Sequence, residues 1–95
     1  MTQQGGIREI RHEARVLFVL LDAIDAEGLV AGTHFQSRWL ELKTRFDRGA
    51  SYESEAENSY ALLKAIARAG AIERTWMQFR WRAVEARIRG AGFFI

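Results

Sequence analysis

The sequence contains no cysteine and no proline in 95 residues. Without cysteine it has no disulfide framework, no thiolate metal site and no cysteine nucleophile. Without proline it has no proline-rich linker, although an average chain of this length holds about five prolines. Long hydrophobic runs are also missing, because the apolar run 16–21 is shorter than the core of a signal peptide or a membrane-spanning helix. We therefore expect no membrane association and a cytoplasmic location.

The composition is that of a folded domain. Hydrophobic residues make up 48% of the chain and charged residues 27%, with a formal net charge of +2. This balance is too apolar and too weakly charged for a disordered chain, and the length suits one domain. We expect a single helical domain over 1–95, with a flexible N-terminus at 1–6 and a flexible apolar tail at 90–95.

Glycines divide the chain into segments with helical periodicity. Gly28 fits the position after a helix end, with Leu29 contacting Ile24 as in a Schellman motif. We find no internal repeat. The pattern predicts an all-α, compact four-helix domain, with helices at about 7–27, 34–48, 52–69 and 72–89.

The last segment has an alternative interpretation. Met77, Phe79 and Trp81 alternate with polar residues, as in a strand. The stretch 62–74 (LLKAIARAGAIER) resembles the passage from recognition helix to wing in the winged-helix family, and this resemblance implies a β-hairpin after it. Because 71–89 contains no Gly, Pro, Asn or Asp to form the hairpin turn, we favour a helix.

As a helix, 72–89 has two apolar faces. Trp76 and Phe79 lie on one of them, and the sequence does not determine which face enters the core. If Trp76 is buried, the opposite face is in surplus and is predicted to bind a partner or a second copy. That face consists of Met77, Trp81, Val84 and Ile88. The tail residues Phe93, Phe94 and Ile95 either plug their own domain or dock on the same partner.

The sequence does not point to an enzyme. Glu9 and His12 have a spacing used in di-iron bundles, but such a site needs a second copy of the motif, and none is found. Ser51 and Ser54 are better explained as helix caps, and no nucleophile or phosphate-loop motif occurs. We expect no catalytic residues, no metal and no cofactor.

Arginines concentrate towards the C-terminus, beside aromatic residues that could stack on bases. Two helices meeting at Gly70 resemble a helix-turn-helix, which implies that 72–89 would contact DNA. The residues predicted to contact nucleic acid or an acidic partner are Arg74, Thr75, Gln78, Arg80, Arg82 and Arg89.

Taken together, the residues predict a non-enzymatic macromolecule-binding protein. The first hypothesis is a small protein-binding inhibitor or adaptor that acts through its Trp/Arg-rich last helix and forms a homodimer. In size and in its lack of catalytic motifs the chain is similar to small phage-encoded accessory proteins, including anti-CRISPR inhibitors. The alternative is a helix-turn-helix or winged-helix transcriptional regulator that binds DNA.

Overall fold

Four α-helices make up the described part of the chain. The structure, a computed structural model, describes the backbone of residues 2–47 and 52–92 and the side chains of 10–47 and 53–92. The helices are α1 (Thr2–Ala26), α2 (Gln36–Asp47), α3 (Tyr52–Arg68) and α4 (Trp76–Ala91). No strand occurs among the described residues, so the predicted all-α, four-helix fold is confirmed and the winged-helix alternative is not needed.

The ends of three helices differ from the prediction. α1 begins at Thr2 and includes residues that the sequence assigns to a flexible 1–6 segment. α2 begins at Gln36 instead of 34. α4 begins at Trp76 instead of 72, because the preceding residues form a turn in which the Thr75 N–H donates to the Ile72 carbonyl at 3.1 Å.

The C-terminal end of α4 also lies beyond its predicted position. The helix continues to Ala91 and ends at Gly92, whose φ of 76° is a left-handed conformation that glycine adopts readily. The first residues of the predicted flexible tail are therefore helical, and Phe93, Phe94 and Ile95 lie outside the described residues.

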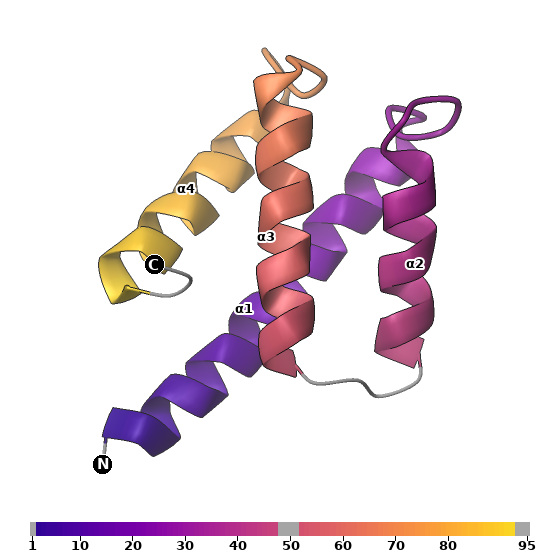
Figure 1. Cartoon of the computed structure of the whole chain (residues 1–95). Coiled ribbons are helices and arrows are strands. Elements are labelled where there is room, and N and C mark those ends of the chain that lie inside the picture. The colour runs from indigo at the N-terminus through magenta and orange to yellow at the C-terminus, as the bar shows by residue number, and fades with distance from the viewer. Residues whose placement is uncertain (1, 48–51, 93–95) are drawn as a thin grey trace.

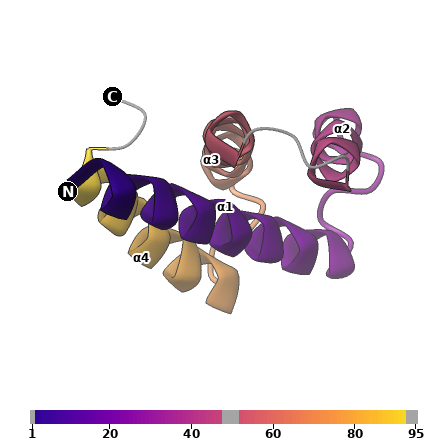
Figure 2. The same ribbon diagram turned by 90° about the horizontal axis from the view of Figure 1, so that it is seen from below.

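The helices form two layers. α1 packs on α3 at the centre, α4 packs on the outer side of α1, and α2 packs on the outer side of α3. Figure 1 shows α1 and α3 crossing, and Figure 2 shows α1 with α4 in one layer and α2 with α3 in the other. The Cα radius of gyration of 13.0 Å is close to that of a compact domain of this length. The core lies between the layers and is built around Leu17, Leu21, Leu63, Ile66 and Trp39.

The chain contains an internal repeat, although we predicted none from the sequence. Residues 13–47, in α1 and α2, align without a gap on residues 55–89, in α3 and α4. Twelve of these 35 pairs are identical, and they are Glu13/Glu55, Ala14/Ala56, Leu20/Leu62, Leu21/Leu63, Ala23/Ala65, Ile24/Ile66, Gly28/Gly70, Thr33/Thr75, Gln36/Gln78, Arg38/Arg80, Trp39/Trp81 and Arg45/Arg87.

The two halves also repeat in three dimensions. All ten buried residues of 13–47 have buried equivalents in 55–89. Exchanging α1 with α3 and α2 with α4 preserves the helix packing, since α1·α4 then becomes α3·α2. The ring centroids of Phe18 and Trp39 lie 5.1 Å apart, and those of the equivalent Tyr60 and Trp81 lie 5.4 Å apart. The fold is therefore two helical hairpins related by an approximate twofold rotation.

The turns that join the helices share most of their hydrogen bonds. Gly28 ends α1 as the Schellman motif predicts, with its N–H donating to the Asp25 carbonyl at 2.9 Å, and Gly70 ends α3 in the same way. The Thr33 hydroxyl donates to the Val30 carbonyl at 2.6 Å, as the Thr75 hydroxyl does to Ile72 at 2.6 Å. Shared turn chemistry thus gives both hairpins the same shape.

The core face of α4 is the one that we expected to be in surplus. Met77, Trp81, Val84 and Ile88 are at most 4% exposed, whereas Trp76 is 58% and Phe79 74% exposed. The reason is the position of α4 at the edge of its layer, where it buries one face against the central helices. The four buried residues belong to the core of one chain and offer no surface to a partner, so the face assignment behind the dimer prediction is reversed.

Candidate binding surface

The repeat separates side chains that the fold requires from those that it does not. Equivalent positions share a local backbone environment, so an apolar side chain at the surface of one half is not needed for packing if its equivalent is polar or small. Such pairs, with matching exposure in both halves, include Val16/Asn58, Val19/Ala61, Trp76/His34, Phe79/Ser37 and Leu40/Arg82. In the first four the larger apolar residue lies on α1 or α4, whereas Leu40 lies on α2.

Three of these α1 and α4 residues, Val16, Val19 and Trp76, line one groove. An open groove of about 350 Å³ runs between the two helices, with Val16, Val19, Leu20 and Ala23 on the α1 side and Trp76 on the α4 side. α1 and α4 lie side by side in both views (Figures 1 and 2). Val19 is 66% exposed, and Phe79 follows Trp76 by three residues on α4. We call this surface the α1/α4 groove.

The rim of the α1/α4 groove is basic. His12 and Arg15 of α1 and Arg80 of α4 line it beside the apolar floor. Tryptophan and arginine are the residue types most enriched where protein interfaces concentrate their binding energy. The groove therefore suits a ligand with apolar side chains flanked by carboxylates.

The equivalent surface between α2 and α3 has a different character. Its hollow is smaller, about 160 Å³, and is lined by Arg38, Glu41, Leu42, Arg45 and Asn58. Arg38 and Asn58 stand where the α1/α4 groove has Arg80 and Val16. The apolar character is thus confined to one of the two related surfaces.

A second groove, of about 320 Å³, lies between α3 and α4 and is mainly cationic. Its basic residues are Lys64, Arg68, Arg82 and Arg89, accompanied by Gln78 and by one carboxylate, Glu85. It shares no residue with the α1/α4 groove. We call it the α3/α4 groove.

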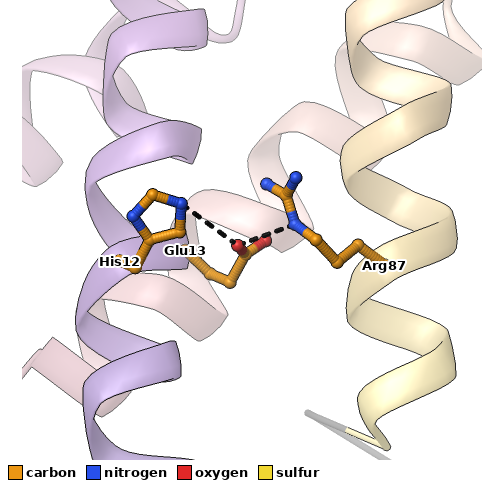
Figure 3. A network of polar contacts seen from close by, with 3 residues as sticks. All are labelled: His12, Glu13 and Arg87. Atoms are coloured by element: carbon orange, nitrogen blue, oxygen red, sulfur yellow. Dashed lines mark hydrogen bonds and ion pairs between the residues drawn. The ribbon is translucent and has the colours of Figure 1, made fainter.

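A buried carboxylate joins α1 to α4. Glu13 is 3% exposed, and its Oε1 accepts a hydrogen bond from Nε of Arg87 at 2.9 Å. Figure 3 shows Arg87 reaching this carboxylate from the opposite helix, with His12 on the other side at 3.9 Å. The pair fixes α4 against α1 and so holds the α1/α4 groove in shape.

The equivalent carboxylate is not paired in the same way. Glu55 is 2% exposed, and its Oε2, like that of Glu13, has no hydrogen-bond partner. Arg45, equivalent to Arg87, forms an ion pair with Glu41 at 2.8 Å instead of a hydrogen bond with Glu55. Burial raises the pKa of Glu55, and of its two charged neighbours Arg45 lowers that pKa while Glu41 raises it. Glu41 stands where the second half has Ala83, so a single difference between the repeats explains the altered pairing.

The residues predicted to contact nucleic acid or an acidic partner are divided between the two grooves. Arg80 lies at the α1/α4 groove, whereas Gln78, Arg82 and Arg89 lie at the α3/α4 groove. Thr75 uses its hydroxyl in the turn before α4, and the Arg74 N–H donates to Oε1 of Gln78 at 3.0 Å. The structure therefore does not gather the six residues on one face.

Sequence reasoning missed several residues of these grooves, notably Arg15, Val19, Lys64 and Arg68. Each lies on a helix whose exposed side looked unremarkable when it was considered alone. The internal repeat points to these residues, because it aligns Val19 with the smaller Ala61 and Arg15 with the oppositely charged Glu57.

Searches for known features and relatives add little. Within the described residues, no helix is long and apolar enough to cross a membrane, and no group of three or more His, Cys, Asp or Glu side chains is placed to hold a metal ion. No protein-family model matches the chain, and no curated protein or solved structure matches it either.

Proposed function

We propose that this chain is a non-enzymatic protein-binding module, an inhibitor or adaptor, that takes an acidic amphipathic helix of a partner into its α1/α4 groove. One observation carries the proposal: the groove exposes Val19 and Trp76, with Phe79 exposed beside them on α4, where the other half of the fold has Ala61, His34 and Ser37. Exposed apolar residues that packing does not require are typical of surfaces that a partner covers.

The chemistry of the rim indicates the kind of partner. Arg15 and Arg80 stand on opposite helices across the groove, so a helix lying between them would meet a cation on each side. Acidic residues on the flanks of an apolar stripe would pair with both arginines and set the orientation. A helix laid in an apolar groove is a recurrent mode of peptide recognition.

The geometry favours this proposal over a helix-turn-helix DNA reader. A helix-turn-helix joins its helices by a turn of three or four residues, whereas residues 69–75 separate α3 from α4. The N-terminal end of α4, which such a reader would place in the major groove, exposes Trp76 and Phe79.

The experiment exchanges residues between the repeats. The double variant Trp76→His, Phe79→Ser installs the residues that the first half carries, so the fold should be retained. Affinity capture from cells of the native source should recover one or more proteins with the wild-type chain and lose them with this variant. Synthetic peptides covering acidic amphipathic helices of the captured protein should then bind the wild type and bind the variant at least about tenfold more weakly.

A matched control changes the α3/α4 groove instead. The variant Arg82→Leu, which installs the first half's Leu40, should capture the same proteins as the wild type. Equal capture by all three proteins would contradict the proposal, provided that circular dichroism shows each to be folded.

A further inference from the structure

The two halves of the molecule differ systematically in charge. Within the aligned ranges, equivalent exposed or half-exposed positions that both carry a charge have opposite signs in four pairs, which are Arg15/Glu57, Asp22/Lys64, Lys43/Glu85 and Asp47/Arg89. The fold does not require these inversions, because burial is the same or nearly the same on both sides of each pair. Two pairs keep their sign: Arg38/Arg80, and Arg45/Arg87, whose second member binds a buried carboxylate.

Three of the inverted pairs fall on one pair of surfaces. Lys64, Glu85 and Arg89 line the α3/α4 groove, and with Arg68 and Arg82 they give it a formal charge of +3. The positions on α1 and α2 that correspond to this groove carry Asp22, Asp25, Lys43 and Asp47, with a formal charge of −2. We call this second surface the α1/α2 face.

The α1/α2 face and the α3/α4 groove occupy equivalent positions in the two halves. Each lies between the two helices of one hairpin, and the hairpins share most of their turn hydrogen bonds and their pattern of buried residues. Lys43 reaches Asp25 at 4.0 Å across the α1/α2 face and lies 5.4 Å from the ring centroid of Trp39. Leu40, 51% exposed, adds an apolar group at the position equivalent to Arg82.

We infer that the α1/α2 face of one copy of this chain docks on the α3/α4 groove of a second copy. The acidic face of the first copy meets the basic groove of the next, and the Leu40 side chain has the aliphatic stem of Arg82 as an apolar counterpart. The first copy then keeps its α3/α4 groove free and the second keeps its α1/α2 face free, so the contact is heterologous and copies join head to tail. The docking residues are distinct from those that line the α1/α4 groove.

The details of the inversion favour a second copy over a polyanion such as DNA. A groove adapted to phosphate alone gains nothing from Glu85, whose charge repels phosphate. A groove adapted to the other face of its own chain gains from an anion, because that face carries the cation Lys43 among its carboxylates. The sign reversal runs in both directions, as complementarity between the two faces requires.

The association is electrostatic and should depend on salt. Charges separated by more than about 8 Å are largely screened at physiological ionic strength. Sedimentation velocity of the wild-type chain should show a mass that rises with protein concentration at about 25 mM NaCl and falls back towards one chain at about 500 mM NaCl.

Two variants that exchange charges between the repeats test the assignment. Asp22→Lys with Asp47→Arg makes both faces basic, and Lys64→Asp with Arg89→Asp makes both faces acidic. Each variant alone should associate about tenfold or more weakly than the wild type, because every docking now opposes like charges. An equimolar mixture of the two variants should associate again, since a basic face then meets an acidic one.

A matched control separates the faces from net charge. Glu57→Lys with Glu73→Lys alters net charge by the same amount as the first variant but lies outside both faces, and it should associate like the wild type at a given salt concentration. A wild-type chain that stays monomeric at low salt would overturn the inference. So would a mixture of the two variants that fails to associate. If the wild type stays monomeric and its groove binds a short DNA duplex, a binding that the Lys64→Asp, Arg89→Asp variant loses, then the groove is a polyanion site and the inference is wrong.

Discussion

Arg87 on α4 donates a hydrogen bond from Nε to Oε1 of Glu13 on α1 at 2.9 Å, and the carboxylate that receives it is almost completely buried. The equivalent residues Arg45 and Glu55 share no such hydrogen bond in the structure, because Arg45 bonds Glu41 on its own helix. One chain thus contains the same buried carboxylate with and without a hydrogen bond from the equivalent arginine. The difference allows the energetic role of each to be measured against the other.

We predict that Glu13→Gln destabilises the protein by about 1–3 kcal/mol, the range for hydrogen bonds to charged groups. The amide keeps the shape of the side chain but removes the negative charge that Arg87 binds. Urea denaturation followed by circular dichroism at pH 7 measures the change in the free energy of unfolding. A loss below about 0.5 kcal/mol would mean that water solvates the half-exposed Arg87 as favourably as Glu13 binds it, so that the hydrogen bond adds little net stability.

We predict the opposite sign for Glu55→Gln at pH 7. Burial raises the pKa of Glu55 above its ordinary value of 4.5, which applies to the unfolded chain. The folded state therefore binds the proton more tightly, so stability falls as pH rises from about 4.5 through the raised pKa. Glu55→Gln removes this cost and should stabilise the protein by about 1 kcal/mol at pH 7, with a gain that shrinks towards pH 4.5.

The pH series distinguishes this cause from better packing. Urea denaturation of the wild type and of Glu55→Gln at several values between pH 4.5 and pH 8 should give curves that converge on the acidic side. Two parallel curves would show that the charge of Glu55 is not responsible.

Glu41→Ala should bring the first half closer to the second. This substitution installs the equivalent of Ala83, removes an anion that raises the pKa of Glu55 and frees Arg45 from its ion pair. The pKa of Glu55 should then fall, which carbon-detected NMR titration of its carboxyl group can measure. An unchanged pKa would show that Arg45 does not turn to Glu55 when Glu41 is absent.

The periodicity of apolar residues was enough to predict four helices, because each helix buries a stripe that recurs every three or four residues. It could not predict which face of α4 is buried, because Trp76 and Trp81 are both bulky apolar residues on opposite sides of one helix. That choice depends on where α4 packs, which the sequence of α4 does not contain. The repeat indicates the buried face of α4, since Trp81 aligns with Trp39 of the core stripe of the second helix and each tryptophan follows an arginine.

The same comparison explains why the grooves were only partly predicted. Arg80, Arg82 and Arg89 were predicted to contact a partner because arginines cluster near the C-terminus. Their partners across each groove, Arg15 and Lys64, come from helices far away in the sequence, and only the tertiary fold brings them together. A surface made by two distant helices is not visible in the periodicity of either one.

The two tryptophans of α4 should respond very differently to substitution. Trp81 is 4% exposed and stacks near Tyr60, so Trp81→Ala should cost about 3–5 kcal/mol and can unfold a domain of this size. Trp76 is 58% exposed, so Trp76→Ala should change the free energy of unfolding by less than about 0.5 kcal/mol. Urea denaturation of both variants makes the comparison, and a larger loss for Trp76→Ala would reverse our assignment of the faces.

Arg74 occupies a left-handed backbone conformation that its equivalent, Gly32, adopts without strain. The φ angle is 66° at Arg74 and 80° at Gly32, and each residue donates its backbone N–H to the glutamine four residues later. A left-handed conformation costs a residue with a Cβ about 1 kcal/mol or more, partly offset by the greater freedom of glycine in the unfolded chain. Arg74→Gly should therefore stabilise the protein by about 0.5–1 kcal/mol. Arg74→Ala, which removes the side chain but keeps the Cβ, should leave stability nearly unchanged, whereas an equal gain from both would assign the effect to the arginine side chain instead of the backbone.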